Sequence, residues 1–409
     1  MILKKKIMVA LSAACLLTAP GLVSAEGFGI NEWSAEGVAM GGARMFAEDD
    51  PANLAYNPAG LTKIKGEGWK SGAVYVSPHG RYKAYDKDGK LIESGKNVVS
   101  PGILPHFYYV RQIDEKQWFG IGSFVRFGMI SEFGKESAVR TNAYRSELKG
   151  ISLTPTYAWK PDAKFSAAIG AEINHVGLSL QKRAMVPNVG EVDTKTKGDS
   201  TALGWNAAVN YAFDEKNEVG LVYRSKITHT MEADFKSSFA PMNSKAHGKV
   251  VLPDTFALGY NHKFDDKTRV ELNGTYTRWS TYDKLDIYFD NPMVPDNKDP
   301  KDWKNGWRYA IGVEHKLSDK YTAMAGFAYD ESAIPDERAD FMIPTGARRT
   351  YSLGVQYHDK KQTLALTLGQ IDIGGKSITA KKHAQETFDH AYTHGNYAKV
   401  IAIGYERKL

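Results

Sequence analysis

The sequence predicts an all-β protein: a 14-stranded antiparallel transmembrane β-barrel with an N-terminal lumenal plug, or hatch. Three observations predict it. After about residue 68, apolar and polar side chains alternate within segments bounded by turns; short turns alternate with long loops; and residues 26–67 lack this pattern. The mean hydropathy of −0.41 agrees, because barrel strands alternate lipid-facing apolar with lumen-facing polar residues. We therefore divide the chain into residues 1–25, 26–67 and 68–409.

Residues 1–25 are expected to be a cleaved secretory signal peptide. Lys4, Lys5 and Lys6 form a basic start, an apolar stretch follows, and Val-Ser-Ala at 23–25 places small residues before the scissile bond. The apolar stretch is much shorter than the roughly 20 residues that a membrane-spanning helix needs. The single cysteine, Cys15, lies within this segment. We therefore expect a mature chain without disulfides, cysteine metal sites or a lipid anchor.

The charge balance excludes a nucleic-acid partner. Lys plus Arg number 53 and Asp plus Glu number 47, a formal net charge of +6, and three of the positive charges lie in the signal segment. A nucleic-acid binder instead concentrates basic residues on one face or element.

Several segments alternate with the period of a β-strand. In 269–277 one face carries Val270, Leu272 and Tyr276, and the other carries Arg269, Glu271, Asn273 and Thr275. Segments 255–262 and 363–369 repeat the pattern. A half-buried strand of a β-sandwich would also alternate, so alternation alone leaves both architectures open.

The lengths of the connections favour a barrel over a sandwich. Short turns are expected at 114–116, 161–163, 214–216, 265–267, 318–320 and 359–361. Longer polar loops are expected at 79–101, 128–147, 181–199, 231–250, 289–304, 331–348 and 373–395. Seven long and six short connections imply 14 strands, with the tight turns and both termini on the periplasmic side of the outer membrane. The final segment from residue 397 to 409 should close the barrel, although Leu409 stands where such barrels commonly end in an aromatic residue.

Residues 26–67 carry motifs that resemble a known family. Gly27-Phe28-Gly29-Ile30-Asn31 follows the expected cleavage site, a Gly41-Gly42-Ala43 turn comes next, and Tyr56-Asn57-Pro58-Ala59-Gly60-Leu61 ends the segment. This order closely resembles the hatch of the FadL-like outer-membrane transporters of long-chain fatty acids and hydrocarbons. The later stretches 252–255, 276–280, 307–312 and 329–338 resemble the second half of that family, whereas residues 80–250 match it in layout more than in motif.

The resemblance implies a function and candidate site residues. Family members are plugged 14-stranded barrels with a hydrophobic site near the outer loops and a lateral exit through the wall. Carried over, Phe28 would lie near the inner end of the ligand path, where movement of the mature N-terminus opens it. Asn57, Pro58 and Ala59 would hold the hatch in the lumen. Pro58 also restricts Asn57 to extended conformations, which leaves the Asn57 amide free either to bond the wall or to cap a helix or turn.

Charges near the expected outer rim form a second candidate group. Asp330 ends one predicted strand, and Arg348 and Arg349 begin the next, so these residues should face one another. A lumenal arginine there could bind a ligand carboxylate. A structural ion-pair network is the alternative for each of them.

Other functions are weighed against this one. His383, Glu386, His390 and His394 share one loop, but the order required for a zinc protease is missing, and we expect no metal and no cofactor. No GxSxG motif indicates a lipase, so an enzyme is not expected. A general porin for small polar solutes is the closest alternative, and an adhesive barrel is a third.

The sequence therefore predicts a monomeric outer-membrane uptake channel for hydrophobic molecules, above all long-chain fatty acids. Its partners would be these ligands and the outer-membrane lipid. Capture at the outer loops would be followed by gated, passive diffusion and lateral exit. The sequence alone leaves the ligand open among fatty acids, aromatic hydrocarbons and other apolar molecules.

Overall fold

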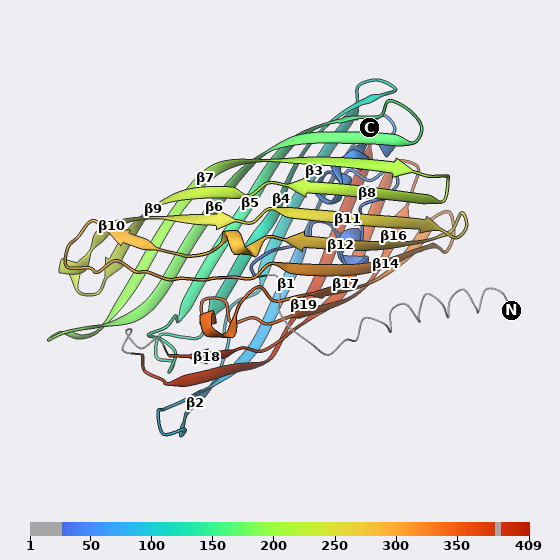
Figure 1. Ribbon diagram of the computed structural model, residues 1–409. Coiled ribbons are helices and arrows are strands. Elements are labelled where there is room, and N and C mark those ends of the chain that lie inside the picture. The colour runs from blue at the N-terminus through green and yellow to red at the C-terminus, as the bar shows by residue number, and fades with distance from the viewer. Residues whose placement is uncertain (1–26, 381–385) are drawn as a thin grey trace.

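The computed structural model describes residues 27–380 and 386–409, so the expected signal peptide and His383 lie outside the described residues. Its β-strands form one antiparallel sheet that closes on itself (Figure 1). Strand β1 (Glu67–Tyr85) pairs with β19 (His390–Lys408) from Gly68 opposite Lys408 to Tyr85 opposite His390. Closure pairs the first wall strand with the last, so that neither is left as an edge strand in lipid.

The remaining strands follow one another around the ring. They are β2 (Leu91–Lys96), β3 (Gly102–Gln112), β4 (Gln117–Glu132), β5 (Arg145–Trp159), β6 (Phe165–Val186), β7 (Gly190–Ala212), β8 (Asn217–Arg224), β9 (Ile227–Ser237), β10 (Ser244–Leu252), β11 (Thr255–Lys263), β12 (Thr268–Thr277), β13 (Ile287–Phe289), β14 (Gly306–Lys316), β15 (Tyr321–Asp330), β16 (Arg348–His358), β17 (Gln362–Ile373) and β18 (Ser377–Thr379). Consecutive strands β8 and β9, and β10 and β11, form single passages through the wall, and β2, β13 and β18 are short outer additions. The described chain thus forms the predicted 14-stranded barrel.

The two faces of the wall follow the predicted alternation. On β12, Arg269 and Glu271 are 5% and 0% exposed and face inward, whereas Leu272 is 47% exposed and faces outward. On β11, Leu258 also faces outward and is 60% exposed. Apolar side chains therefore meet lipid, and polar ones line the interior.

Several of the expected long loops are wrong in part. Loop 128–147 contains the end of β4 and the start of β5, and loop 373–395 contains β18 and the start of β19. Residues 181–199 continue β6 and β7 as a hairpin that pairs up to Val186 opposite Gly190. Residues 231–250 likewise lie mostly in β9 and β10, and 79–101 contains the end of β1 and all of β2. Beyond the bilayer the outward face of a strand meets water and carries charged side chains, such as Glu232 and Asp234 of β9, whereas Met231 and Phe235 are buried on the inner face. The sequence of these segments therefore resembles a polar loop. Their backbone hydrogen bonds still favour pairing.

Residues 27–66 precede β1 and lie inside the ring (Figure 1). They contain helix α2 (Ala35–Ala39), helix α3 (Asn53–Tyr56) and the 3-10 helix η1 (Pro58–Lys63). Ser34 caps α2 by accepting a hydrogen bond at 3.0 Å from the backbone N–H of Gly37. None of the described helices has the length and apolar character needed to cross a membrane.

Inward-facing glycines let the α2 region approach the wall closely. A Cβ added to Gly326 on β15 would lie 2.1 Å from the backbone N of Gly41, and one added to Gly312 on β14 would lie 2.6 Å from Met40. Backbone therefore packs directly against backbone here, and a larger residue at these positions would displace the α2 turn. Three further 3-10 turns, η2 (Ala240–Met242), η3 (Trp279–Thr281) and η4 (Asp336–Arg338), lie in the outer connections.

Candidate functional site

The wall contains a gap between β3 and β4, which we call the window. The two strands pair only from Phe107 opposite Ser123 to Gln112 opposite Trp118. Beyond that point, residues 102–106 of β3 pair with β1 alone, and residues 124–131 of β4 pair with β5 alone. The facing edges of these two stretches are therefore unpaired with each other.

The ends of the window are closed by hydrogen bonds. At its outer end, the N–H of Val98 donates to the carbonyl of Glu132 at 2.7 Å, and the Asn97 side chain accepts from the N–H of Glu132 at 3.1 Å.

On β4 itself the register with β5 slips between Val125 and Phe127, which is a β-bulge at Arg126. Bulges bend a strand and are frequent beside functional sites.

A cavity of about 900 Å³ passes through this window. Its lining includes inward-facing residues that are almost fully buried, such as Leu148, Phe133 and Ile343, at 4% to 8% exposure. It also includes Ile103 and Ile151 on the outer surface, which are 67% and 40% exposed. The cavity therefore joins the interior beneath the outer loops to the lipid-facing side of the wall.

The N-terminal segment, residues 27–30, covers the free edge of β4 from the inside. The N–H of Ile30 donates to the carbonyl of Arg126, and the N–H of Gly128 donates to the carbonyl of Phe28, both at 2.9 Å. Gly29 and Phe127 form an isolated antiparallel bridge between these bonds. The N-terminal segment thus supplies hydrogen bonds that β3 does not supply at this point.

Phe28 lies in an aromatic cluster and is 1% exposed. Its ring centroid is 4.9 Å from that of Trp279, 5.4 Å from Tyr282 and 5.6 Å from Trp303, and it also meets Phe127 at 6.0 Å. Phe127 follows the β4 bulge, and the other three rings come from the connection between β12 and β14. The ring of Phe28 therefore joins the window edge to the outer loops.

The outer loops above the cluster are tied together by a buried lysine. The Nζ of Lys301 lies 2.8 Å from Asp299 and 2.6 Å from Asp340, which belongs to the connection between β15 and β16. Burial would lower the pKa of Lys301, but Asp340 and Asp299 outweigh it and raise that pKa above its ordinary value. The two connections also bury apolar side chains such as Leu285, Trp303 and Phe341 in one cluster, so they form an apolar roof over the barrel interior.

Arg348, a predicted site residue, faces inward and holds the N-terminal segment. Its guanidinium donates to the carbonyls of Gly27 at 2.6 Å and Gly29 at 3.1 Å. Arg348 also lines the cavity, and its Nε has no hydrogen-bond partner among the described residues. Arg349 points the opposite way: it is exposed on the outer face, over the ring of Tyr329 at 5.9 Å.

Asp330 faces Arg348 in the strand register, as the sequence suggests, but its ion pair is with another residue. Its carboxylate lies 2.8 Å from Nε of Arg308, and both side chains are buried. Arg308 in turn donates to the carbonyl of Gly41 at 2.8 Å. Asp330 thus supports a hatch contact, and neither it nor Arg349 lines the cavity.

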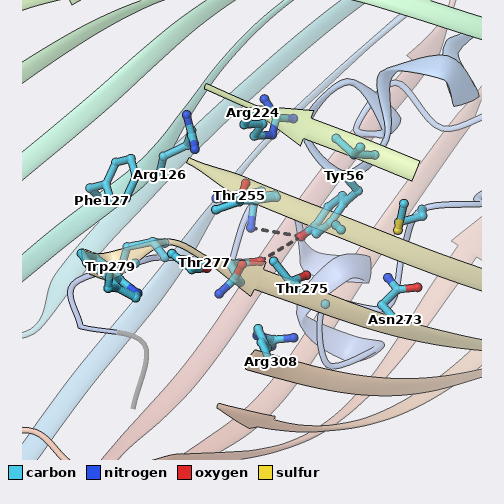
Figure 2. A pocket seen from close by; sticks show the side chains of 18 residues that line it. Tyr56, Arg126, Phe127, Arg224, Thr255, Asn273, Thr275, Thr277, Trp279 and Arg308 are labelled. Atoms are coloured by element: carbon cyan, nitrogen blue, oxygen red, sulfur yellow. Dashed lines mark hydrogen bonds between the residues drawn. The ribbon is translucent and has the colours of Figure 1, made fainter. Parts of the chain in front are cut away.

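The interior below the cluster is nearly full. A pocket of about 60 Å³ lies between the N-terminal residues and β8, β11 and β12. Polar side chains such as Arg224, Thr255, Asn273 and Thr277 line it (Figure 2). Tyr56 projects into it and accepts from the backbone N–H of Trp33 at 3.1 Å. This space has room for a few water molecules only.

The three residues of the predicted hatch motif lie at the start of η1, fully buried. The Asn57 amide donates to Oδ1 of Asn210 on β7 at 2.5 Å, and Oδ1 of Asn57 accepts from the N–H of Ala59 at 3.2 Å. Pro58 occupies the first helical position, where its missing N–H costs no hydrogen bond. The Asn57 side chain therefore both contacts the wall and caps η1.

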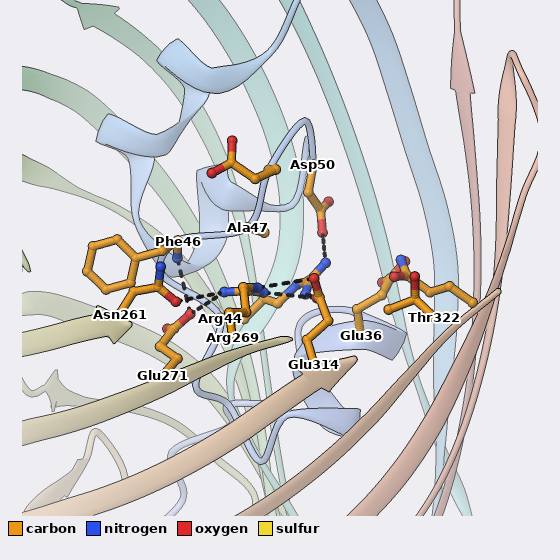
Figure 3. Close-up of polar contacts among 12 residues, drawn as sticks. Glu36, Arg44, Phe46, Ala47, Asp50, Asn261, Arg269, Glu271, Glu314 and Thr322 are labelled. Carbon is orange, nitrogen blue, oxygen red and sulfur yellow. Dashed lines mark hydrogen bonds and ion pairs between the residues drawn. The ribbon is translucent and has the colours of Figure 1, made fainter. Parts of the chain in front are cut away.

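Buried ion pairs fix the body of the hatch to the wall (Figure 3). Arg44 pairs with Asp50 at 3.2 Å and with Glu314 of β14, which also binds Arg269 of β12 at 3.0 Å. Glu271 of β12 accepts from the backbone N–H of Met45. Two strands of the wall thereby hold the 44–50 turn.

A second set of ion pairs centres on Lys70 of β1, which is 0% exposed. Its Nζ lies 3.0 Å from Glu36, 2.5 Å from Asp50 and 3.1 Å from Glu406 of β19. Burial would raise the pKa of Asp50, but Lys70 and Arg44 outweigh it and hold the pKa below its ordinary value. The cation therefore neutralises carboxylates from the hatch and from the strand that closes the barrel.

Within residues 27–380 and 386–409 no group of three or more His, Cys, Asp or Glu side chains is placed to hold a metal ion. Of the four residues considered in the sequence, Glu386 contacts the amide of Asn142, and His390 lies beside Asp389.

Sequence reasoning missed the window and the aromatic cluster. Pro105 within β3 was the available signal for the window, because a proline inside a strand indicates an edge. Nothing local in the sequence brings Phe28 next to Trp279 and Trp303, since these contacts depend on how the loops fold over the barrel.

The comparisons with known proteins agree over most of the chain. The family profile described as "Outer membrane protein transport protein (OMPP1/FadL/TodX)" matches residues 16–408. Outer membrane protein P1 of Haemophilus influenzae is 27% identical, over 92% of both chains. The long-chain fatty acid transport protein of Escherichia coli K12 is 24% identical, over 89% of this chain and 92% of that relative.

Solved structures share the fold. A FadL homologue of Pseudomonas aeruginosa matches with a TM-score of 0.84 and 19% identity, over 93% of this chain and 99% of that one. The toluene transporter TodX of P. putida matches with a TM-score of 0.71 and 17% identity, over 92% and 98%.

Replacement of Lys70 by Ala should release the hatch. It leaves the buried carboxylates of Glu36 and Glu406 without their cation and leaves Asp50 with Arg44 alone, at a cost of about 3–5 kcal/mol. Hydrogen exchange of residues 36–50 should therefore accelerate. Lys245→Ala is the control, because its ion pair with Asp234 is fully exposed and is screened by solvent. Equal protection of the hatch in both variants would contradict the role assigned to Lys70.

Proposed function

Because the chain belongs to the outer membrane protein transport family that includes FadL and TodX, we propose that it takes up long-chain fatty acids through the outer membrane. Proteins of this family are outer-membrane transport channels for hydrophobic compounds. For this chain we propose capture beneath the outer loops, gated passive diffusion and lateral exit by a single chain. The cavity that crosses the wall at the window is the observation that carries the proposal.

The shape of the cavity suits an apolar chain. It begins under the roof formed by the outer loops and ends beside Ile103 on the lipid-facing surface. A hydrophobic molecule following it would pass from apolar contacts into lipid without crossing the periplasmic half of the lumen. The tightly filled interior below Phe28 opposes the alternative, a porin, because a porin needs an open aqueous bore.

Arg348 supports a fatty acid over a neutral hydrocarbon. In the described structure it holds two neutral carbonyls of the N-terminal segment and has no carboxylate partner. A guanidinium can bind a carboxylate through two parallel hydrogen bonds between opposite charges, which two separate neutral carbonyls do not offer. A fatty-acid carboxylate reaching Arg348 would therefore compete with Gly27 and Gly29 for it.

The N-terminal segment is the proposed gate. It covers the β4 edge with two backbone hydrogen bonds and is held further by Arg348 and by the ring of Phe28. Withdrawal of residues 27–30 would widen the inner mouth of the window while leaving the ion-paired hatch body in place. A ligand that takes the place of Gly27 and Gly29 at Arg348 would release the N-terminal segment, so ligand binding would open the gate.

Affinity for fatty acids should rise with acyl-chain length. Apolar burial contributes about 0.8 kcal/mol per methylene, or roughly a fourfold lower Kd for each added carbon while the cavity has room. Titration of the purified protein with saturated fatty acids of graded length measures this dependence, with the corresponding alcohols as controls for the carboxylate. An affinity independent of chain length, or a high conductance to small ions in planar bilayers, would contradict the proposed function.

A disulfide between the N-terminal segment and β4 should block uptake reversibly. Gly29 and Phe127 form a non-hydrogen-bonded antiparallel pair, whose Cα atoms lie about 4.5 Å apart and can accept a disulfide. The double variant Gly29→Cys with Phe127→Cys should lose fatty-acid uptake when oxidised and regain it on reduction.

The two single-cysteine variants are the controls for this experiment, because they change the same positions without a cross-link. Full uptake by the oxidised double variant, with the disulfide verified by mass spectrometry, would show that the N-terminal segment is no gate.

A further inference from the structure

The outer surface of the wall has a groove on the side formed by β14 to β17. Its volume is about 800 Å³, and its lining is apolar, including Ile311, Val313, Leu353, Leu366 and Leu368. Leu353 and Leu368 are 68% and 58% exposed, so these side chains face the membrane. The groove is separate from the cavity at the window, which lies between β3 and β4.

A small residue on β15 creates the groove. Ala325 points outward between Val313 of β14 and Leu353 of β16, its direct neighbours in the strand register. The methyl group of Ala325 extends less far from the wall than the larger side chains on either side, so it forms the bottom of the groove. Apolar side chains from the two neighbouring strands therefore surround an acyl-chain-sized channel on the surface.

Two cations stand at the outer end of the groove. Arg349 lies on the same outward face of β16 as Tyr351 and Leu353, and Lys399 of β19 lies opposite Gln370, which lines the groove. Both cations are exposed, and neither forms an ion pair within the described part of the chain. Asp372 lies directly opposite Arg349 in the strand register without an ion pair to it, and its carboxylate accepts from the Gln370 amide at 2.6 Å.

Along the outer surface of the wall, the side chains change from apolar to aromatic and charged toward the outer loops, as a membrane changes from hydrocarbon to headgroups. In the outward row across β16, β17 and β19, Leu353, Leu368 and Ile401 are apolar neighbours. The next outward row toward the loops is Tyr351, Gln370 and Lys399, and Arg349 lies one further step along β16. Aromatic and long cationic side chains are typical of the level where lipid headgroups begin.

We propose that this groove binds one molecule of lipid A, the phosphorylated glycolipid of the outer leaflet. An acyl chain occupies the channel over Ala325, and a phosphate lies between Arg349 and Lys399. Charge complementarity selects a phosphorylated headgroup, and the position beside the long outer connections selects the outer leaflet. The site requires only that the barrel lies in the outer membrane, so it is independent of the transported ligand.

Native mass spectrometry of the detergent-purified protein with added diphosphoryl lipid A tests the proposal. The wild-type protein should retain one lipid A molecule, and Arg349→Gln should weaken retention about tenfold. Ala325→Phe should abolish retention, because the ring fills the channel. Ala171→Phe, which alters an exposed outward alanine on β6, and Lys197→Gln, which removes an exposed cation on β7, are the matched controls.

Folding is checked by the heat-dependent gel mobility of each variant, and Arg349→Gln keeps the test valid if Ala325→Phe fails to fold. Lipid A without its phosphates should bind the wild-type protein as weakly as lipid A binds Arg349→Gln. Equal binding of a neutral phospholipid, or an equal loss of lipid A in both control variants, would overturn the proposal.

Discussion

The backbone N–H and C=O groups of a β-strand in a membrane must find hydrogen-bond partners, because lipid offers none. Part of β4 lacks a partner strand on one side, so its backbone groups there must be bonded in another way. Residues 124–131 have a partner strand on only one side. The N-terminal segment supplies two of the missing hydrogen bonds from inside the barrel. The same contacts that satisfy the edge of β4 therefore also narrow the inner mouth of the window.

The rest of the interior divides into a firmly held part and a lightly held part. The hatch body is fixed by buried ion pairs centred on Arg44 and Lys70, whose disruption costs about 3–5 kcal/mol for each cation removed. The N-terminal segment is held by a few backbone hydrogen bonds and by burial of one aromatic ring, worth about 1.5–3 kcal/mol. Local opening should therefore occur at residues 27–30 before the hatch body moves.

The sequence predicts the architecture well because apolar and polar residues alternate along each strand, according to the face of the wall on which they lie. Rows such as Arg269 and Glu271 inside and Leu272 outside follow directly from alternation. The outer hairpin of β6 and β7 escaped prediction because its exposed face carries cations such as Lys195 and Lys197 where a membrane strand carries apolar residues. The absence of a neighbouring strand does not change the alternation of residues along β3 or β4. Pro105, a proline inside a strand, was therefore the available signal for the window.

The candidate residues show the same limit. Asn57 could be placed from its motif, since its neighbours in the chain set its conformation. Arg348 and Arg349 were grouped as one site, yet adjacent residues of a strand point to opposite faces. One contacts the N-terminal segment, and the other faces lipid. The ion pair of Asp330 with Arg308 depends on a third strand, which sequence proximity does not indicate.

The most direct test of the account is the hydrogen-exchange rate of the Gly128 amide, which donates to the carbonyl of Phe28. The rate is measured with and without saturating fatty acid, and the amide of Gly122, on the paired part of β4, is the internal reference. If the ligand displaces the N-terminal segment, exchange at Gly128 accelerates while that at Gly122 stays unchanged. Unchanged or slower exchange at Gly128 would contradict the claim that this segment is the gate.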